Sequence, residues 1–152
     1  MNEIKIVTEL LGLAHVGVTN YRMKGQNEIE ISLETTLEAA VCPDCGELSV
    51  TMQRKDEAQS IRDLTMWNRR CTLHYTPQRF RCSRCQATFV EQVAWRRAGT
   101  SYTLRYEQYL YERTCREPIA QIAQDEGVSE DTVQAIFVRW AKKQSPSVAI
   151  LA

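Results

Sequence analysis

Four of the six cysteines form two Cys-x-x-Cys pairs, a residue type and spacing suited to binding a metal. The first pair is Cys42 and Cys45, followed by Gly46, and the second is Cys82 and Cys85. A tight turn of this kind holds two thiolates at the separation that a tetrahedral ion requires. Zinc is the expected metal for a closed set of four sulfurs, although CPxCG turns also occur around iron. We therefore predict one structural Zn2+ bound by Cys42, Cys45, Cys82 and Cys85.

Other uses of these cysteines fit the sequence less well. Disulfides need an oxidising compartment, which nothing in the chain indicates, and a thioredoxin-like redox site needs only one such pair in a βαβ setting. The 36 residues between Cys45 and Cys82 exceed the spacing of a compact zinc ribbon, so we expect strands in this segment and an elaborated ribbon. We interpret Cys71 and Cys115, outside both pairs, as free, buried thiols.

A second motif spans residues 118–142, where two helices are predicted on either side of a glycine. Pro118 suits the first position of a helix, Gly127 can adopt the left-handed conformation that ends it, and Ser129 can cap a second helix. Ala123 is small enough for the two helices to cross closely. The predicted inward positions are Ile122, Ala123, Val133, Ile136, Phe137 and Trp140. This spacing predicts a helix-turn-helix, with an ordinary helical hairpin in an unrelated core as the alternative.

The second helix of this motif would protrude from the surface and fit the major groove of DNA. We predict that its outward side chains contact DNA: Ser129, Glu130, Asp131, Thr132, Gln134, Ala135, Val138 and Arg139. Ser129 and Thr132 lie near the helix N-terminus, where a phosphate or a base edge can be met. Gln134 and Arg139 are the polar side chains best suited to reading bases.

The net charge of zero is an average over three unlike segments. Residues 1–65 hold 6 Lys and Arg against 11 Asp and Glu, residues 66–117 hold 10 against 4, and residues 118–152 hold 3 against 4. The basic middle segment leads into the helix-turn-helix, where phosphate contacts would be needed. A solvated face is the other reading of these arginines.

Three arginines of the middle segment are candidate DNA contacts. Arg96 and Arg97 lie in a connector at 93–100, which either follows phosphates, enters a minor groove or serves only as a linker. Arg105 follows in a predicted helix at 101–115. Three others are expected to offset the surplus negative charge of four thiolates: Arg79, Arg81 and Arg84.

The expected fold class is α+β: a small zinc-ribbon-like β module with an N-terminal helix and hairpin, followed by an all-α, three-helix helix-turn-helix domain. In the first of these modules, the apolar periodicity predicts one helix, at 3–13, and strands at 16–24, 28–34, 49–54, 71–75 and 78–81. The expected domains are 1–95 for the α/β cap and zinc module, 96–143 for the helix-turn-helix, and 144–152 for a tail that breaks at Ser145-Pro146.

Composition and motifs also argue against several classes of protein. No segment has the length of a membrane span or the pattern of a signal peptide, so we expect a cytoplasmic protein without a membrane partner. A closed four-thiolate site leaves no position for a reacting water, and both histidines, His15 and His74, lie outside any catalytic motif. We therefore expect a binding protein and not an enzyme.

The ordered motifs resemble the N-terminal half of bacterial insertion-sequence transposases of the ISL-three type. The resemblance covers about residues 9–142 and rests on LLGL, CPDCG, RFRCSRC, the Arg-rich connector and IAQIAQDEGVSEDTV. It implies zinc ligation by the four paired cysteines, base reading by the helix at 129–142, and recognition of double-stranded DNA at terminal inverted repeats.

The family's catalytic Asp/Asp/Glu domain follows the helix-turn-helix, whereas this chain ends about ten residues after it. We therefore expect no strand transfer by this chain alone. A transcriptional regulator derived from a transposase and a zinc-ribbon adaptor for protein interaction are the alternatives. A homodimer or a protein partner is possible in each case.

Overall fold

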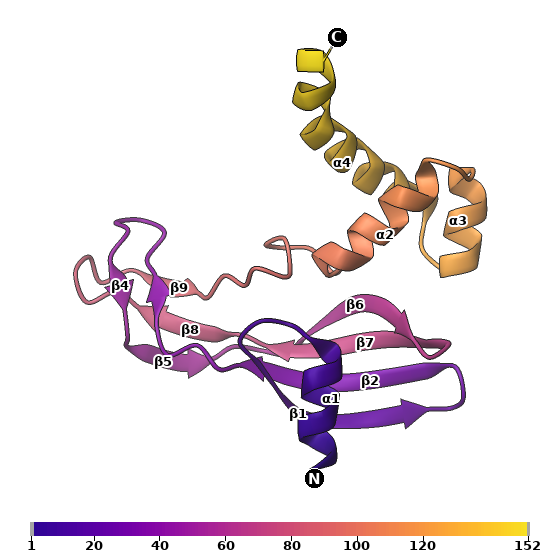
Figure 1. Cartoon of the computed structure of the whole chain (residues 1–152). Helices are drawn as coiled ribbons and strands as arrows, with labels where there is room; N and C mark the ends of the chain where they lie inside the picture. Colours follow the sequence, from indigo (N-terminus) through magenta and orange to yellow (C-terminus); the bar gives the residue numbers. More distant parts are fainter. Residues whose placement is uncertain (1, 152) are drawn as a thin grey trace. The chain divides into compact units, whose positions relative to one another are not determined.

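The computed structural model describes residues 2–151, with side chains described to residue 143, and its fold class is α+β (Figure 1). The chain divides into two compact units, Met1–Thr103 and Leu104–Ala152. The first unit contains all the strands and the paired cysteines, and the second is helical. Each unit is described by itself below.

A four-stranded mixed sheet forms the larger part of the first unit, in the order β1-β2-β7-β6. The strands are β1 (Val16–Lys24), β2 (Glu28–Thr35), β6 (Gln59–Met66) and β7 (Arg69–Thr76). β1 with β2 and β6 with β7 form antiparallel pairs, whereas β2 and β7 are parallel neighbours. The predicted hairpin of β1 and β2 is confirmed. The 71–75 strand exists but pairs in this sheet, so its expected place in the zinc ribbon is wrong.

One face of this sheet carries the hydrophobic core, because alternate residues of each strand point to the same side. Ile31 of β2, Leu73 of β7 and Ile61 of β6 are completely buried. Helix α1 (Glu3–Leu11), which Asn2 caps, packs Ile4, Val7 and Leu11 against the β1 side of this face (Figure 1). Its position agrees with the predicted helix at 3–13.

The zinc-binding part of the first unit is built from five short strands. They are β3 (Ala40–Val41), β4 (Leu48–Ser49), β5 (Met52–Lys55), β8 (Gln78–Arg81) and β9 (Thr88–Val90). β3 pairs with β4, and β5, β8 and β9 form a three-stranded antiparallel sheet. The strand predicted at 49–54 is therefore two strands, with a break after Ser49.

The segment at 93–103 is folded onto the first unit. Trp95 is 8% exposed in the core of the four-stranded sheet, with its ring edge-on to Tyr75 at 5.2 Å between centroids. Backbone bonds join Arg62 N–H to Ser101 C=O and Thr103 N–H to Arg62 C=O, so this segment extends the β6 edge. The segment predicted as a basic connector is therefore held on the first unit, because burial of the Trp95 indole fixes it.

The second unit consists of three helices, α2 (Leu104–Thr114), α3 (Ile119–Glu126) and α4 (Glu130–Leu151). Pro118 has extended backbone angles, φ −64° and ψ 143°, so it is the N-cap and not the first helical residue as predicted. α4 continues through Ser145-Pro146, where a break was expected, so residues 144–151 prolong this helix.

Cys115, expected to be buried, is exposed at the end of α2, whereas Cys71 is buried as predicted. Within the residues that the structure describes, no helix is long and apolar enough to cross a bilayer.

Candidate metal centre and nucleic-acid interface

The four paired cysteines converge on one point in the first unit. Their sulfur atoms all lie within 4.8 Å of one another, and two of the distances that join the turns are 3.6 Å from Cys42 to Cys85 and 3.5 Å from Cys45 to Cys82. A tetrahedral zinc ion with Zn–S bonds of about 2.3 Å needs sulfur atoms about 3.8 Å apart. The arrangement fits this requirement, and these cysteines are the ligands of one structural zinc ion.

The two Cys-x-x-Cys turns have the same backbone hydrogen bonds. Gly46 N–H donates to Cys42 C=O at 2.9 Å, and Gln86 N–H donates to Cys82 C=O at 3.0 Å. The residue after each second cysteine has a left-handed backbone, with φ 77° at Gly46 and φ 66° at Gln86. Sequence reasoning identified Gly46 but missed Gln86, because a glutamine gives no signal for a left-handed position.

Backbone N–H groups of these turns point at the sulfurs and act on their acidity. The N–H of Cys85, with that of Arg84, lowers the pKa of the Cys82 thiol to about 7. Glu47 N–H also lowers the pKa of Cys45, but burial and the neighbouring sulfurs outweigh it and raise that pKa to about 12. A thiolate at Cys82 is therefore available near neutral pH, and a bound metal ion would favour the thiolate form of the other three cysteines.

Phe80 and Phe89 form the apolar support of the metal centre. Their rings stack at 6.1 Å between centroids, and both pack with Cys42 and Cys82 in one buried cluster. Two of the nearby arginines, which were expected to offset the charge of the thiolates, lie beside carboxylates in the structure. Arg79 pairs with Asp56 at 3.1 Å, and Arg84 lies 3.6 Å from Glu47.

The helix-turn-helix lies wholly in the second unit, and its turn is built as the sequence predicts. Gly127 has φ 68° and ends α3, with its N–H bonded to Ala123 C=O. Ser129 Oγ accepts the N–H of Thr132 at 3.1 Å and caps α4. The predicted inward residues include three that are at most 1% exposed, Ile122, Val133 and Ile136, and Ala123 at 6%.

Packing of that apolar face leaves a row of side chains on the opposite side of α4 in contact with solvent. We call these residues the exposed stripe of α4: Glu130, Asp131, Gln134, Ala135 and Val138. They recur at intervals of four residues and so lie along one side of the helix. The stripe begins at the N-terminus, where backbone N–H groups carry a partial positive charge.

Arg139 differs from the residues of the exposed stripe, because its guanidinium has a partner within the unit. Its Nη2 lies 3.1 Å from Oε2 of Glu107 on α2, and Glu107 is completely buried. Trp140 donates its indole N–H to the other carboxylate oxygen at 3.0 Å. Sequence reasoning missed Glu107, since a glutamate at a helix position gives no sign that it faces the core.

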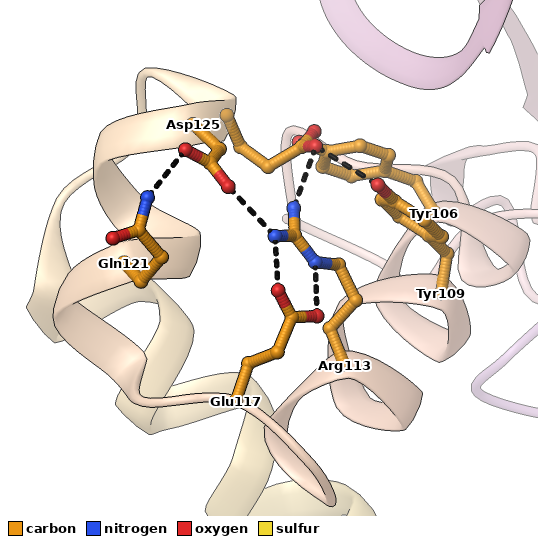
Figure 2. Close-up of polar contacts among 7 residues, drawn as sticks. Tyr106, Tyr109, Arg113, Glu117, Gln121 and Asp125 are labelled. Carbon is orange, nitrogen blue, oxygen red and sulfur yellow. Dashed lines mark hydrogen bonds and ion pairs between the residues drawn. The ribbon is translucent and has the colours of Figure 1, made fainter.

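A second polar network joins α2 to α3 (Figure 2). Arg113 donates both to Glu117, at 2.7 and 2.8 Å, and to Asp125 at 2.8 Å. Glu126, 8% exposed, accepts from Arg113 at 3.2 Å, from Tyr106 OH at 2.7 Å and from a further tyrosine hydroxyl at 3.0 Å. These contacts fix α3, and through it the turn that orients α4.

The remaining candidate contacts are divided between the units. Arg96 and Arg97 belong to the first unit, and Arg96 Nε donates to Thr100 C=O at 2.7 Å. Arg105 belongs to α2 in the second unit. All three side chains are partly exposed.

Two family models match the chain in the order of these sites. A model described as the zinc-finger of transposase IS204/IS1001/IS1096/IS1165 matches residues 38–85, which include all four cysteine ligands. A model described as the helix-turn-helix domain of transposase family ISL3 matches residues 91–141. No curated protein and no solved structure matches the chain. The chain therefore carries the zinc-finger and helix-turn-helix domains that form the N-terminal DNA-binding region of ISL3-family transposases.

Proposed function

We propose that this chain is a sequence-specific DNA-binding protein that recognises the terminal inverted repeats of an insertion element. The observation that supports this best is the exposed stripe of α4, whose side chains stay in contact with solvent when the three helices pack. A helix held in this way by a helix-turn-helix enters the major groove with its N-terminal half against the bases. The zinc ion stabilises the first unit and has no open position for chemistry.

Affinity for the phosphates must come from outside the exposed stripe. Residues 104–152 hold six Lys and Arg against seven Asp and Glu, and the stripe itself begins with two acids. We propose that Arg105 in the second unit and Arg96 and Arg97 in the first contact phosphates, while Ser129 and Thr132 meet the backbone near the α4 N-terminus. Such contacts position the protein without reading sequence.

The test is a binding titration of the zinc-loaded chain on inverted-repeat duplex and on a shuffled duplex of equal length, at rising salt. We expect tighter binding to the inverted repeat and a log-linear loss of affinity with salt. Gln134→Ala should reduce the ratio of the two affinities by roughly 10-fold or more. Gln108→Ala, a matched change at an exposed glutamine of α2, should leave that ratio unchanged.

The phosphate contacts have a different signature. Changing Arg96 and Arg97 together to alanine should weaken binding to both duplexes alike and lower the salt slope by about two. Equal affinity for the two duplexes, or affinity that does not change with salt, would contradict the proposed function. Loss of discrimination with the arginine pair but not with Gln134 would reassign the reading surface to the first unit.

A further inference from the structure

The exposed stripe of α4 has a chemical composition that limits which base edges it can contact. Glu130 and Asp131 offer only acceptors when ionised, Gln134 offers both a donor and an acceptor, and Ala135 and Val138 are apolar. Between Glu130 and Val138 the stripe contains no cationic side chain; the next residue at this spacing, Lys142, is exposed and lies beyond it. The major-groove edge of guanine presents only acceptors, N7 and O6, which repel a carboxylate and are usually bound by arginine or lysine.

Arg139 is the one arginine of α4, and it is committed elsewhere. Its guanidinium pairs with the fully buried Glu107, and its Nε is itself buried. If Arg139 turned toward a guanine, the buried Glu107 carboxylate would lose a cation that lies 3.1 Å from it inside the unit. The pair therefore holds this arginine away from a bidentate contact with guanine.

The same stripe matches other base edges well. An apolar side chain such as Val138 or Ala135 contacts the thymine methyl group, a glutamine pairs with adenine N6 and N7, and a carboxylate accepts from cytosine N4. At a rise of about 1.5 Å per residue, the stripe from Glu130 to Val138 is about 12 Å long. At about 3.4 Å per base pair, it faces three to four base pairs.

Resting on the proposed function, we infer that α4 recognises thymine methyl groups and the exocyclic amino groups of adenine and cytosine. Guanine N7 and O6 are not contacted by the exposed stripe. The exclusion depends on the contact between Arg139 and Glu107, which removes the usual guanine reader from the surface. The acids at the start of the stripe then add selectivity against guanine edges by repulsion.

The test uses the zinc-loaded full chain and duplexes selected by it from a random library. In the selected duplex, each thymidine is replaced in turn by deoxyuridine, which lacks the methyl group, and each guanine by 7-deazaguanine, which lacks N7. We expect deoxyuridine at one or two positions to weaken binding roughly fourfold each. We expect 7-deazaguanine within the three or four base pairs facing α4 to change the affinity by less than about twofold.

A protein variant assigns the methyl contact to the stripe. Val138→Ala should weaken binding to the thymidine duplex and remove the penalty for deoxyuridine at one position, because the methyl group has then lost its partner. Val50→Ala is the matched control, since Val50 is 72% exposed in the first unit and Val138 is 38% exposed. This control should keep the full deoxyuridine penalty.

The outcomes separate this inference from the function on which it rests. A selected sequence with strong 7-deazaguanine penalties and no effect of deoxyuridine would overturn the inference, while the proposed function would stand. Recovery of no common sequence from the library would overturn sequence-specific binding itself. A deoxyuridine penalty that persists in Val138→Ala and in Ala135→Gly would place the methyl contact outside α4 and would also overturn the inference.

Discussion

Glu107 on α2 and Trp140 on α4 are joined by a hydrogen bond of 3.0 Å between the indole N–H and a completely buried carboxylate. Because Arg139 binds the other carboxylate oxygen, a single glutamate fixes two consecutive residues of α4. Together with the buried Val133 and Ile136, this contact fixes the rotation of α4 about its own axis relative to α2, and therefore which side chains form the exposed stripe.

Glu107→Ala should lower the free energy of unfolding of the second unit by about 2–4 kcal/mol, because it leaves the half-buried Trp140 indole N–H without this acceptor and opens a cavity where the buried carboxylate was. Glu107→Gln keeps an acceptor for Trp140 and should cost less, about 1–2 kcal/mol. Urea denaturation followed by Trp fluorescence measures both. Glu112→Ala, at an exposed position of α2, is the control, and an equal loss in this control would refute the role of Glu107.

The stability of the second unit should be sensitive even to the replacement of Arg113 by lysine. Its planar fork makes two bonds to Glu117 and others to Asp125 and Glu126 (Figure 2), and an ammonium cannot reproduce this geometry. We expect Arg113→Lys to lower the thermal midpoint of the second unit by an amount equivalent to about 1–3 kcal/mol. Arg116→Lys, at an exposed position near the end of α2, should have no measurable effect.

The same network predicts a dependence of stability on pH. Arg113 holds the pKa of Glu117 and of Asp125 below the ordinary range of these carboxyls, through hydrogen bonds and charge. A carboxyl with a lowered folded-state pKa stabilises the fold above its unfolded pKa, and this stabilisation is lost as the pH falls through the folded value. The helical unit should therefore lose stability as the pH falls below about 4.5.

Arg113→Met provides the control for this dependence. Without the guanidinium, the two carboxyls should titrate as in the unfolded chain, so the acid-induced loss of stability should become shallower. The measurement is helical circular dichroism in urea between pH 3 and pH 7. An unchanged pH profile in Arg113→Met would show that other groups cause the acid sensitivity.

The sequence predicted the metal ligands and the helix-turn-helix because both depend on local spacing. Cys-x-x-Cys turns and a glycine between two amphipathic helices are set by the backbone of a few residues, and these short-range rules are strong. A local error in the helix-turn-helix is Pro118, which was expected inside α3 and is its N-cap. Both positions accept a residue without an N–H group.

The predictions failed where long-range contacts decide the outcome. β6 was missed because Asp63 occupies a core position of the strand, 1% exposed and bonded to Thr103 Oγ1 at 2.8 Å, which breaks the apolar alternation. Trp95 was assigned to a basic connector because two arginines follow it, although Val93 and Trp95 alternate as a strand facing a core would. No local signal reveals the parallel pairing of β2 with β7.

Removal of the metal should unfold the zinc-binding part of the first unit and leave the helical unit intact. Chelation, or Cys42→Ser, removes the link that joins two short turns, and β3, β4 and β9 are too short to persist without it. We expect one zinc per chain, and helical circular dichroism from the second unit should remain after chelation. Cys115→Ser changes an exposed thiol outside the metal centre and should keep full zinc content. A loss of zinc from this variant would contradict the assignment of ligands.

Removing a glycine from the first metal-binding turn and introducing one into the second should have opposite effects on zinc retention. Gly46 has a left-handed backbone at φ 77°, a conformation that strains any residue with a Cβ. Gly46→Ala should therefore weaken zinc retention and cost about 1 kcal/mol, although the added Cβ itself would meet no neighbouring atom within 4 Å. Gln86 occupies the equivalent position of the second turn at φ 66°, and its Nε2 donates to Ser83 C=O at 3.0 Å. Gln86→Gly relieves the backbone strain but loses this exposed hydrogen bond, so it should be neutral or stabilising by up to about 1 kcal/mol. Competition with a chromogenic chelator measures both changes, and a loss of zinc affinity in Gln86→Gly as large as that in Gly46→Ala would show that strain at Gln86 is absent.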